Sequence, residues 1–402
     1  MATHAGAMAK HFGARLTVMH ALLEPPNGNI SRPPPLSEAI LWRMRPSLLL
    51  FLSLAAPGAG LEPGAVVRSD DAGFYRNTVP QVARLGNHHL LAVFSSTAKS
   101  GGPGKVYGAT STDHGRAWGA PKLLMEHATR TMADPNILVD GNKVFVLATQ
   151  VNVPNRIDKS WTIAIRSHDH GATWSAPYEI PIPRQYVAGK QHNGIVLRDG
   201  TYLVGVAWDK WPERGMAART EGEMDLTAGV LISKDGERWT LHGALHANEV
   251  QLTPGGTRGL CEPALVELDT GEVLMILRSG GSFHYESRSR DGGLTWSPPQ
   301  PSALPGHNTP TALYRVEQAL VAVWNNSPLT RYPLSTALSR DGGKTWSAPR
   351  VLARDGGLQV SYPGLTQAAD GTLVAVWQQA LAGGGRDIRT ARFSLPWIEG
   401  RE

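Results

Sequence analysis

Short apolar runs separated by polar turns recur through most of the chain. Five segments each hold two apolar stretches joined by a Gly-containing turn or its equivalent: residues 136–148, 194–206, 264–277, 311–324 and 365–377. Two apolar stretches around such a turn are typical of an antiparallel β-hairpin. No long stretch places apolar residues at helical spacing. We therefore predict an all-β fold.

A second pattern repeats between these hairpins. Its form is Ser-x-Asp-x-Gly-x-Thr-Trp, with one copy a residue short, and the five copies end at Trp118, Trp174, Trp239, Trp296 and Trp346. Asp can hydrogen-bond the backbone that follows it, and Gly supplies a positive φ, so the pattern predicts a tight turn. The Trp ring is expected to pack beneath that turn. About four short strands in each repeat of 50 to 65 residues is typical of a propeller blade.

Composition and charge narrow the range of partners. The 402 residues include 44 Gly and 29 Pro, as expected for a chain with many turns, and the net charge is +5. Lys and Arg are scattered without a run of five or six, so a nucleic-acid partner is not predicted. A basic surface in general, or a basic site for an anionic substrate, fits this balance.

The single cysteine, Cys261, excludes a disulfide within the chain and a Cys-based metal site. It is interpreted as a small buried apolar residue. His, Asp and Glu do not cluster with ligand spacing, so neither a metal nor another cofactor is predicted.

Residues 44–60 resemble a secretory signal. Met44 and Arg45 precede an apolar run over 48–56, and the small residues Ala59 and Gly60 follow. The run is too short to span a membrane, and its alternative interpretation is a buried strand over 48–54. We expect an extension or misassigned start over 1–43, a propeller over 61–397, a tail over 398–402, and a secreted or periplasmic location.

The five Trp-ended repeats resemble the Asp boxes, or BNR repeats, of the sialidase (neuraminidase) superfamily. The similarity runs from about Gly73 to Ser394. It implies an all-β, six-bladed β-propeller with Asp-box hairpins. The boxes are structural and occur in propellers with different functions, so they do not by themselves identify an activity.

Other residues resemble the sialidase site in order and context. Arg76 lies in Phe-Tyr-Arg-Asn-Thr-Val-Pro, Arg278 follows a Glu262-Pro strand across a hairpin, Arg331 precedes the last box, and Tyr362 lies in Ser-Tyr-Pro. The resemblance implies that the three arginines clamp a substrate carboxylate. It also implies a retaining mechanism with Tyr362 as nucleophile and Glu262 as its polarising base.

One part of that pattern is missing. The family places an acid/base Asp in the loop after the first hairpin, but residues 95–111 contain no Asp, Glu or His. Asp134 and His192 are candidates for the missing acid, with turn residues as the alternative interpretation. The substrate could instead have a better leaving group, or the protein could bind glycans without cleaving them.

Four polar residues are further candidates for contacts with sugar hydroxyls: His192, Asn193, Asn308 and Asn325. The leading hypothesis is an exo-α-sialidase-like glycoside hydrolase acting on a glycan with a carboxylated terminal sugar. The alternatives are a non-catalytic glycan-binding propeller and a hydrolase or lyase of uronic-acid glycans. A monomer is expected, without nucleic acid as a partner and without stable membrane insertion.

Overall fold

Antiparallel strands make up nearly all of the regular structure, which confirms the all-β prediction. A computed structural model describes residues 60–152, 160–184, 187–188, 192–209, 225–247, 258–354 and 358–401. The predicted extension and all but the last residue of the predicted leader lie outside these ranges. The described helical segments are two single turns, η2 (Asp71–Gly73) and α2 (Leu395–Ile398). None of the described helices is long and apolar enough to cross a membrane.

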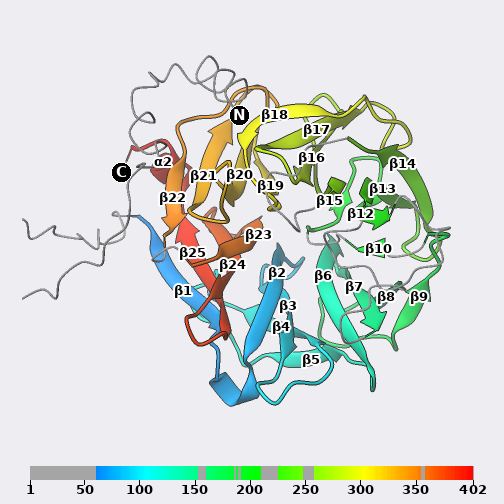
Figure 1. Cartoon of the computed structure of the whole chain (residues 1–402), viewed down its shortest axis with the longest axis vertical. Coiled ribbons are helices and arrows are strands. Elements are labelled where there is room, and N and C mark those ends of the chain that lie inside the picture. The colour runs from blue at the N-terminus through cyan, green and yellow to red at the C-terminus, as the bar shows by residue number, and fades with distance from the viewer. Residues whose placement is uncertain are drawn as a thin grey trace, which may run out of the picture. The chain divides into compact units, whose positions relative to one another are not determined.

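Six sheets surround a common axis as the blades of a propeller (Figure 1). From the innermost strand outward, the first blade consists of β2 (Arg76–Arg84), β3 (Leu90–Thr97), β4 (Lys105–Ser111) and β5 (Lys122–Met125). The second blade consists of β6 (Arg130–Asp140), β7 (Lys143–Asn152), β8 (Ser160–Ser167) and β9 (Tyr178–Ile180). The third blade has β10 (Val187–Ala188) and β11 (Ile195–Val196) innermost, followed by β12 (Tyr202–Asp209), β13 (Asp225–Ser233) and β14 (Thr240–Leu245).

The remaining blades have the same order. The fourth is β15 (Arg258–Glu267), β16 (Val273–Ser279), β17 (Phe283–Ser289) and β18 (Gln300–Pro305), and the fifth is β19 (Ala312–Val316), β20 (Ala319–Asn325), β21 (Leu334–Ser339) and β22 (Arg350–Ala353). The sixth is β23 (Val360–Gln367), β24 (Leu373–Ala380), β25 (Arg386–Phe393) and β1 (Glu62–Val67).

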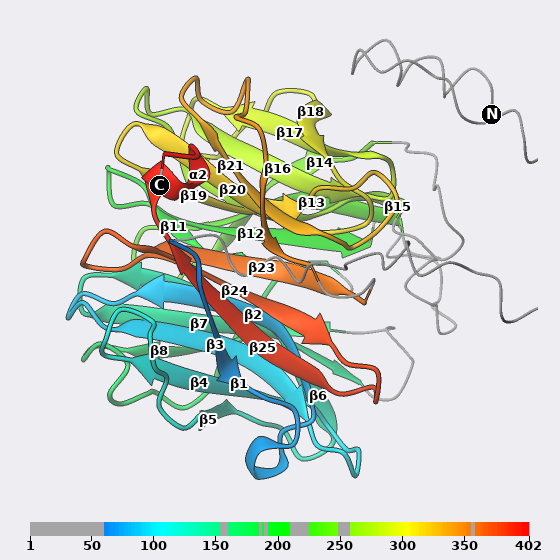
Figure 2. The same ribbon diagram turned by 90° about the vertical axis from the view of Figure 1, so that its left-hand side faces the viewer.

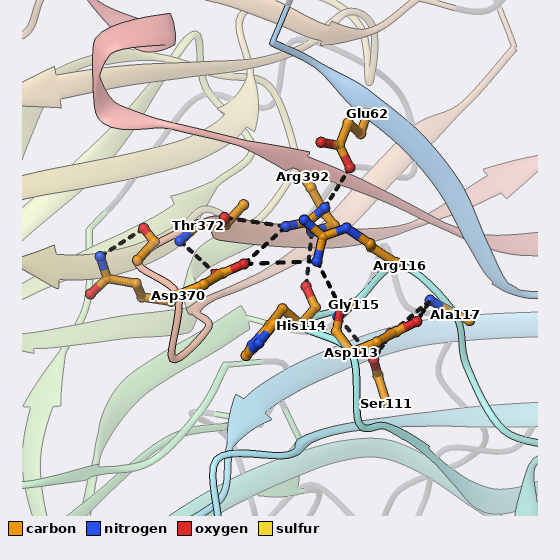
Figure 3. Close-up of polar contacts among 12 residues, drawn as sticks. Glu62, Ser111, Asp113, His114, Gly115, Arg116, Ala117, Asp370, Thr372 and Arg392 are labelled. Atoms are coloured by element: carbon orange, nitrogen blue, oxygen red, sulfur yellow. Dashed lines mark hydrogen bonds and ion pairs between the residues drawn. The ribbon is translucent and has the colours of Figure 1, made fainter.

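The sixth blade closes the ring with the two ends of the described chain. β1 pairs with β25, so Glu62 lies opposite Arg392, and the two strands run side by side in Figure 2. The Arg392 guanidinium binds Glu62 and Asp370 and donates to the carbonyl of His114 (Figure 3). Arg392 is only 3% exposed. One buried cation therefore connects the closing strand to the sixth blade and to the Asp-box loop of the first.

The Asp boxes form the turns that their sequence predicts. In the first box Ser111 Oγ donates to Asp113, and Asp113 accepts the backbone N–H of Ala117 at 2.9 Å (Figure 3). In the fourth box the indole N–H of Trp296 donates to the carbonyl of Gly293 at 2.9 Å. The indole N–H of Trp239 makes the same bond to Gly236 in the third box. Each box lies at the corner between the third and fourth strands of its blade.

Strand direction separates two faces of the propeller. The inner strand of each blade starts at one mouth of the channel, the second strand returns to it, and the third leaves it again. The Asp boxes follow the third strands, so they lie at the opposite face. The mouth where inner strands begin is therefore lined by the first residues of inner strands, the last residues of second strands and the loops into third strands.

The buried core lies mainly within and between the blades. Strands such as β16 and β20 are buried along their whole length, because both of their faces pack against neighbouring blades. Cys261 is 2% exposed within one of these clusters, as predicted for a small apolar residue. From Gly60 onward the described residues belong to one compact unit.

Candidate active site

A repeated backbone irregularity places the central residues of the site. Near the start of the inner strand in four blades, a non-glycine residue adopts a positive φ immediately before a proline: Val79, Asp134, Glu262 and Tyr362, with φ between 48° and 57°. At each of these positions the pairing register shifts by one residue, which defines a β-bulge. Proline cannot donate to the ladder, so within a strand it is accommodated at a bulge.

Asn308 adds a fifth residue of this kind, with φ of 52° two positions before Pro310. Positive φ is uncommon for residues other than glycine and costs backbone energy, and such positions gather at functional sites. Asp134, Glu262 and Tyr362 therefore occupy equivalent positions in the second, fourth and sixth blades. The X-Pro dipeptide that recurs near the start of four inner strands was the sequence signal for this arrangement.

Arg278 lies at the centre of the site, next to the end of β16. Its Nη1 atom is 2.5 Å from Oε1 of Glu262 and 3.4 Å from the Tyr362 hydroxyl oxygen. Its Nε and Nη2 atoms donate to Oδ1 of Asn308 at 3.1 and 2.6 Å. The side chain is 2% exposed. Most of the donors on this guanidinium are therefore engaged by neighbouring residues of the protein.

Arg331 approaches Tyr362 from the loop between β20 and β21. Its Nη1 atom lies 3.4 Å from the Tyr362 hydroxyl oxygen, and its guanidinium carbon lies 5.2 Å from the centre of the Tyr362 ring. Its Nε donates to the backbone carbonyl of Asn308 at 2.9 Å. Two arginines thus flank one phenol, and Asn308 fixes both of them through different atoms.

Arg76 completes the set of predicted arginines and reveals another. It is the first residue of β2, where it pairs with Arg386, the first residue of β25. The Arg386 guanidinium interacts electrostatically with Arg76, Tyr362 and Arg331. Burial lowers the pKa of Arg386, and the neighbouring charges of Arg76 and Arg331 lower it further. Sequence reasoning missed Arg386, although it directly follows Gly383-Gly-Gly at the start of a third strand.

Asn325 has a different position from the one predicted. It is fully buried at the end of β20, where it accepts from Thr309 and donates to the carbonyls of Val360 and Pro333. These bonds hold the start of β23 and the loop that carries Arg331. Asn325 is therefore placed to position the site, and its polar atoms are used within the protein.

His192 and Asn193 lie deeper in the channel. Both line a cavity of about 370 Å³ formed by the later halves of the inner strands, with Gln81, Glu267 and Arg315 among its other lining residues. The Asn193 side chain donates to the carbonyl of Val82 at 2.7 Å. The structure does not bring these two residues into contact with the arginines at the mouth.

The channel also buries two histidines behind the mouth. Burial lowers the pKa of His192 to about 3, with a further contribution from His284. Burial lowers the pKa of His284 to about 4, although hydrogen bonds to the carbonyls of Thr309 and Leu304 act in the opposite direction. Both imidazoles are therefore neutral at neutral pH, which does not suit His192 to the role of a proton donor.

The loop between β3 and β4 offers a cation where an acid would be expected. Within it, Lys99 places its ammonium 5.4 Å from the centre of the Tyr75 ring.

Asp134 is half-buried at its bulge in the second blade. It is thus the carboxylate with the same backbone geometry as Glu262 and Tyr362. Among the described residues, no three His, Cys, Asp or Glu side chains gather as a metal site.

Comparison with known proteins agrees with this architecture. Similar folds occur in the Hadza microbial sialidase Hz136 (TM-score 0.69, 19% identity, 83% of this chain and 68% of that one) and in a leech intramolecular trans-sialidase solved with 2,7-anhydro-Neu5Ac (TM-score 0.67, 14% identity, 85% and 71%). A Dyadobacter fermentans protein of unknown function is also similar (TM-score 0.65, 18% identity, 84% and 99%). No match was found among curated protein sequences.

The fold is a β-propeller similar to those of these sialidases. The family model for the BNR repeat-like domain matches residues 87–375, so the chain belongs to that family. At these identities the solved structures establish the fold alone.

Proposed function

We propose that this protein is an exo-acting glycoside hydrolase for a terminal sugar that carries a carboxylate. The observation that supports it best is the position of the Tyr362 hydroxyl oxygen, which lies 3.4 Å from Nη1 of both Arg278 and Arg331. Two guanidinium groups beside a phenol stabilise its ionised form and attract an anion to the same place. Both effects suit attack on a sugar whose reacting carbon bears a carboxylate.

The arginines differ in how many of their N–H donors remain available to a ligand. Arg278 uses most of its N–H groups on Glu262, Tyr362 and Asn308, so its main role is to hold these groups together. Arg331 and Arg76 form no ion pair with a carboxylate among the described residues and are available to a ligand. A substrate carboxylate would therefore bind chiefly to them, through charge-assisted bonds.

The chemical step would use Tyr362 as the nucleophile. A carboxylate nucleophile would be repelled by the carboxylate of the substrate, whereas a phenol is neutral before it reacts. Glu262, which shares Nη1 of Arg278 with the phenol, would accept the phenolic proton as the bond to the anomeric carbon forms. Water would then release the sugar with net retention, as in other glycosidases with a Tyr nucleophile.

Asp134 is the proposed acid for the leaving group. It stands at the bulge position that presents Glu262 and Tyr362 in two other blades, and it is partly accessible. Asp209, another carboxylate beside the channel, is fully buried and cannot reach a substrate. Asp134 therefore combines the backbone geometry of the site with access to solvent.

A non-catalytic glycan-binding propeller is the second candidate. It is favoured by the β3–β4 loop, where Lys99 lies against Tyr75 and the stretch 95–111 contains no acid. Such a protein would use the arginines to hold the carboxylate and would leave the glycosidic bond intact.

Replacement of Tyr362 by Phe distinguishes the two candidates. The wild-type chain and Tyr362→Phe are tested for release of sugar from fluorogenic sialosides and uronides, and for binding of the free sugar acids by calorimetry. An enzyme loses turnover in the variant while binding changes little. If the wild-type protein binds carboxylated sugars but releases none from any glycoside, the hydrolase proposal is wrong and the binding protein is supported.

A further inference from the structure

Arg386 is held in a fixed position at the mouth. Its backbone N–H donates to the carbonyl of Tyr75 at 2.8 Å, and its carbonyl accepts from the Asn77 side chain at 2.8 Å. Ser96 in turn donates to Asn77 at 2.7 Å, and the Tyr75 hydroxyl donates to the carbonyl of Gly383 at 2.6 Å. These bonds join the first and sixth blades where β2 and β25 begin, so the backbone of Arg386 is held in place from both sides.

The most buried arginines of this protein pair with carboxylates, but several half-buried ones, Arg386 and Arg331 among them, do not do so within the described residues. Arg278 is paired with Glu262, and Arg392 is paired with Glu62 and Asp370. Arg386 is half-buried, yet it forms no ion pair within the part of the chain that the structure describes. Desolvating a cation without a partner is unfavourable. A ligand anion would remove that cost, and the pairing of Arg386 with Arg76 where β25 and β2 begin puts Arg386 at the same mouth of the channel.

The balance of charge around Tyr362 exceeds what one carboxylate can neutralise. Four positive charges come from the arginines at the mouth: Arg76, Arg278, Arg331 and Arg386. Glu262 forms an ion pair with one of them, Arg278. With Asp134 protonated as the proposed acid, a monoanionic sugar would leave two guanidinium charges uncompensated. The Lys99 side chain of the β3–β4 loop adds a further cation on the same face of the propeller.

We propose that Arg386 is a fourth substrate-binding arginine and that the site selects a terminal sugar with a second oxyanion group besides its carboxylate. The shared chemistry is a sulfate, a phosphate or a second carboxylate on the same sugar, bound between Arg386 and Arg76. Each of these groups presents planar or tetrahedral oxygens that match the guanidinium fork. This inference rests on the proposed function, because it assumes that the mouth binds a carboxylated sugar.

The test measures binding to the whole chain by calorimetry at one fixed ionic strength. The ligands are the methyl α-glycoside of sialic acid and the same glycoside carrying an O-sulfate, an O-phosphate or a carboxylate formed by oxidation of its terminal hydroxymethyl group. The proteins are the wild type, Arg386→Gln, the conservative variant Arg386→Lys, and Arg389→Gln. Arg389 is the matched control, since it lies three residues further along β25 and pairs with Asp387.

The wild type should bind at least one of the dianionic glycosides roughly tenfold or more tightly than the monoanionic one, as charge-assisted bonds allow. Arg386→Gln should lose this preference, because it should weaken binding of the dianion more than binding of the monoanion. Arg386→Lys should retain part of the preference, and Arg389→Gln should match the wild type. The preferred dianion identifies the second group.

Two results would overturn the inference. The wild type could show no preference for any dianion, or Arg386→Gln could weaken monoanion and dianion equally. Absence of binding to every carboxylated glycoside would instead overturn the proposed function, so the two failures are distinguishable.

Discussion

Nη1 of Arg278 lies 2.5 Å from Oε1 of Glu262, and the two side chains are 2% and 7% exposed. A buried ion pair of this kind can contribute little net stability, but removal of one partner leaves a desolvated charge. The pair therefore couples the integrity of the site to the stability of the fourth blade.

Arg278→Ala should destabilise the protein by about 3–5 kcal/mol, because it takes the buried cation away from Glu262. Adding Glu262→Gln to the same chain should recover part of this loss, since the second change removes the carboxylate charge. Urea denaturation of the single and double variants measures both effects. If the double variant is less stable than Arg278→Ala by the full cost of Glu262→Gln measured alone, the two residues are not coupled.

Arg331→Ala should weaken ligand binding with little change in stability, because Arg331 has no described carboxylate partner and its side chain is partly exposed. The loss in kcat/KM, or in affinity if the protein only binds, should be roughly tenfold or more for each charge-assisted bond removed. Arg331→Lys keeps the charge and serves as the control for the guanidinium fork. Unchanged affinity in Arg331→Ala would remove this residue from the clamp.

Asp134→Asn should slow hydrolysis of natural glycosides far more than hydrolysis of aryl glycosides, because an aryl leaving group needs little protonation. The ratio of kcat/KM for the two substrate classes is the measurement, with Asp140→Asn on the same strand as a control. If both classes slow by the same factor, Asp134 has another role and the proton must come from elsewhere.

Asp113→Ala should lower the free energy of unfolding by about 1–2 kcal/mol, the net value of one or two hydrogen bonds. Its contacts with Ser111 and Ala117 lie in an Asp-box turn on the face opposite the arginines. Asp113→Asn keeps an acceptor and should lose less. Thermal melting and ligand binding are measured together. Loss of binding at unchanged stability would contradict this prediction, because it would mean that the Asp box contributes to ligand binding rather than to folding.

His192 should make the protein less stable as the pH falls from 6.5 to 5. Burial lowers the pKa of folded His192 to about 3, whereas the unfolded chain takes up this proton near pH 6.5. Stability from the neutral imidazole is therefore complete above pH 6.5 and decreases by up to about 1.4 kcal/mol per pH unit below it. His192→Leu should flatten the dependence, measured by urea unfolding at each pH. An equal slope in both proteins would exclude this contribution.

The fold could be predicted from local patterns because each blade repeats the same short sequence motifs. Alternating strands, the Asp-Gly corners and the Trp plugs act over a few residues, so periodicity alone indicated their arrangement. The order Arg76, Glu262, Arg278, Arg331, Tyr362 was informative for a related reason. Each residue stands at a fixed place in its blade, next to a strand end at the channel mouth.

The remaining features depended on contacts between distant blades. Arg386 comes near the site because β25 and β2 begin side by side, and no local pattern marks that pairing. Asn325 and Asn308 resembled sugar ligands in the sequence, but their polar atoms hold Pro333, Arg278 and Arg331. His192 stands in a cavity that is lined by residues from all six blades.

The pairing of β1 with β25 also constrains the order in which the chain can mature. Glu62 meets Arg392 across more than three hundred intervening residues, so β1 cannot pair until β25 has been synthesised. Until then β1 has no ladder to join, and its backbone hydrogen-bonding groups stay unpaired. Unpaired strands of this kind bind other extended segments readily. Pairing with β25 removes one of the two free edges of β1 and completes the sixth blade.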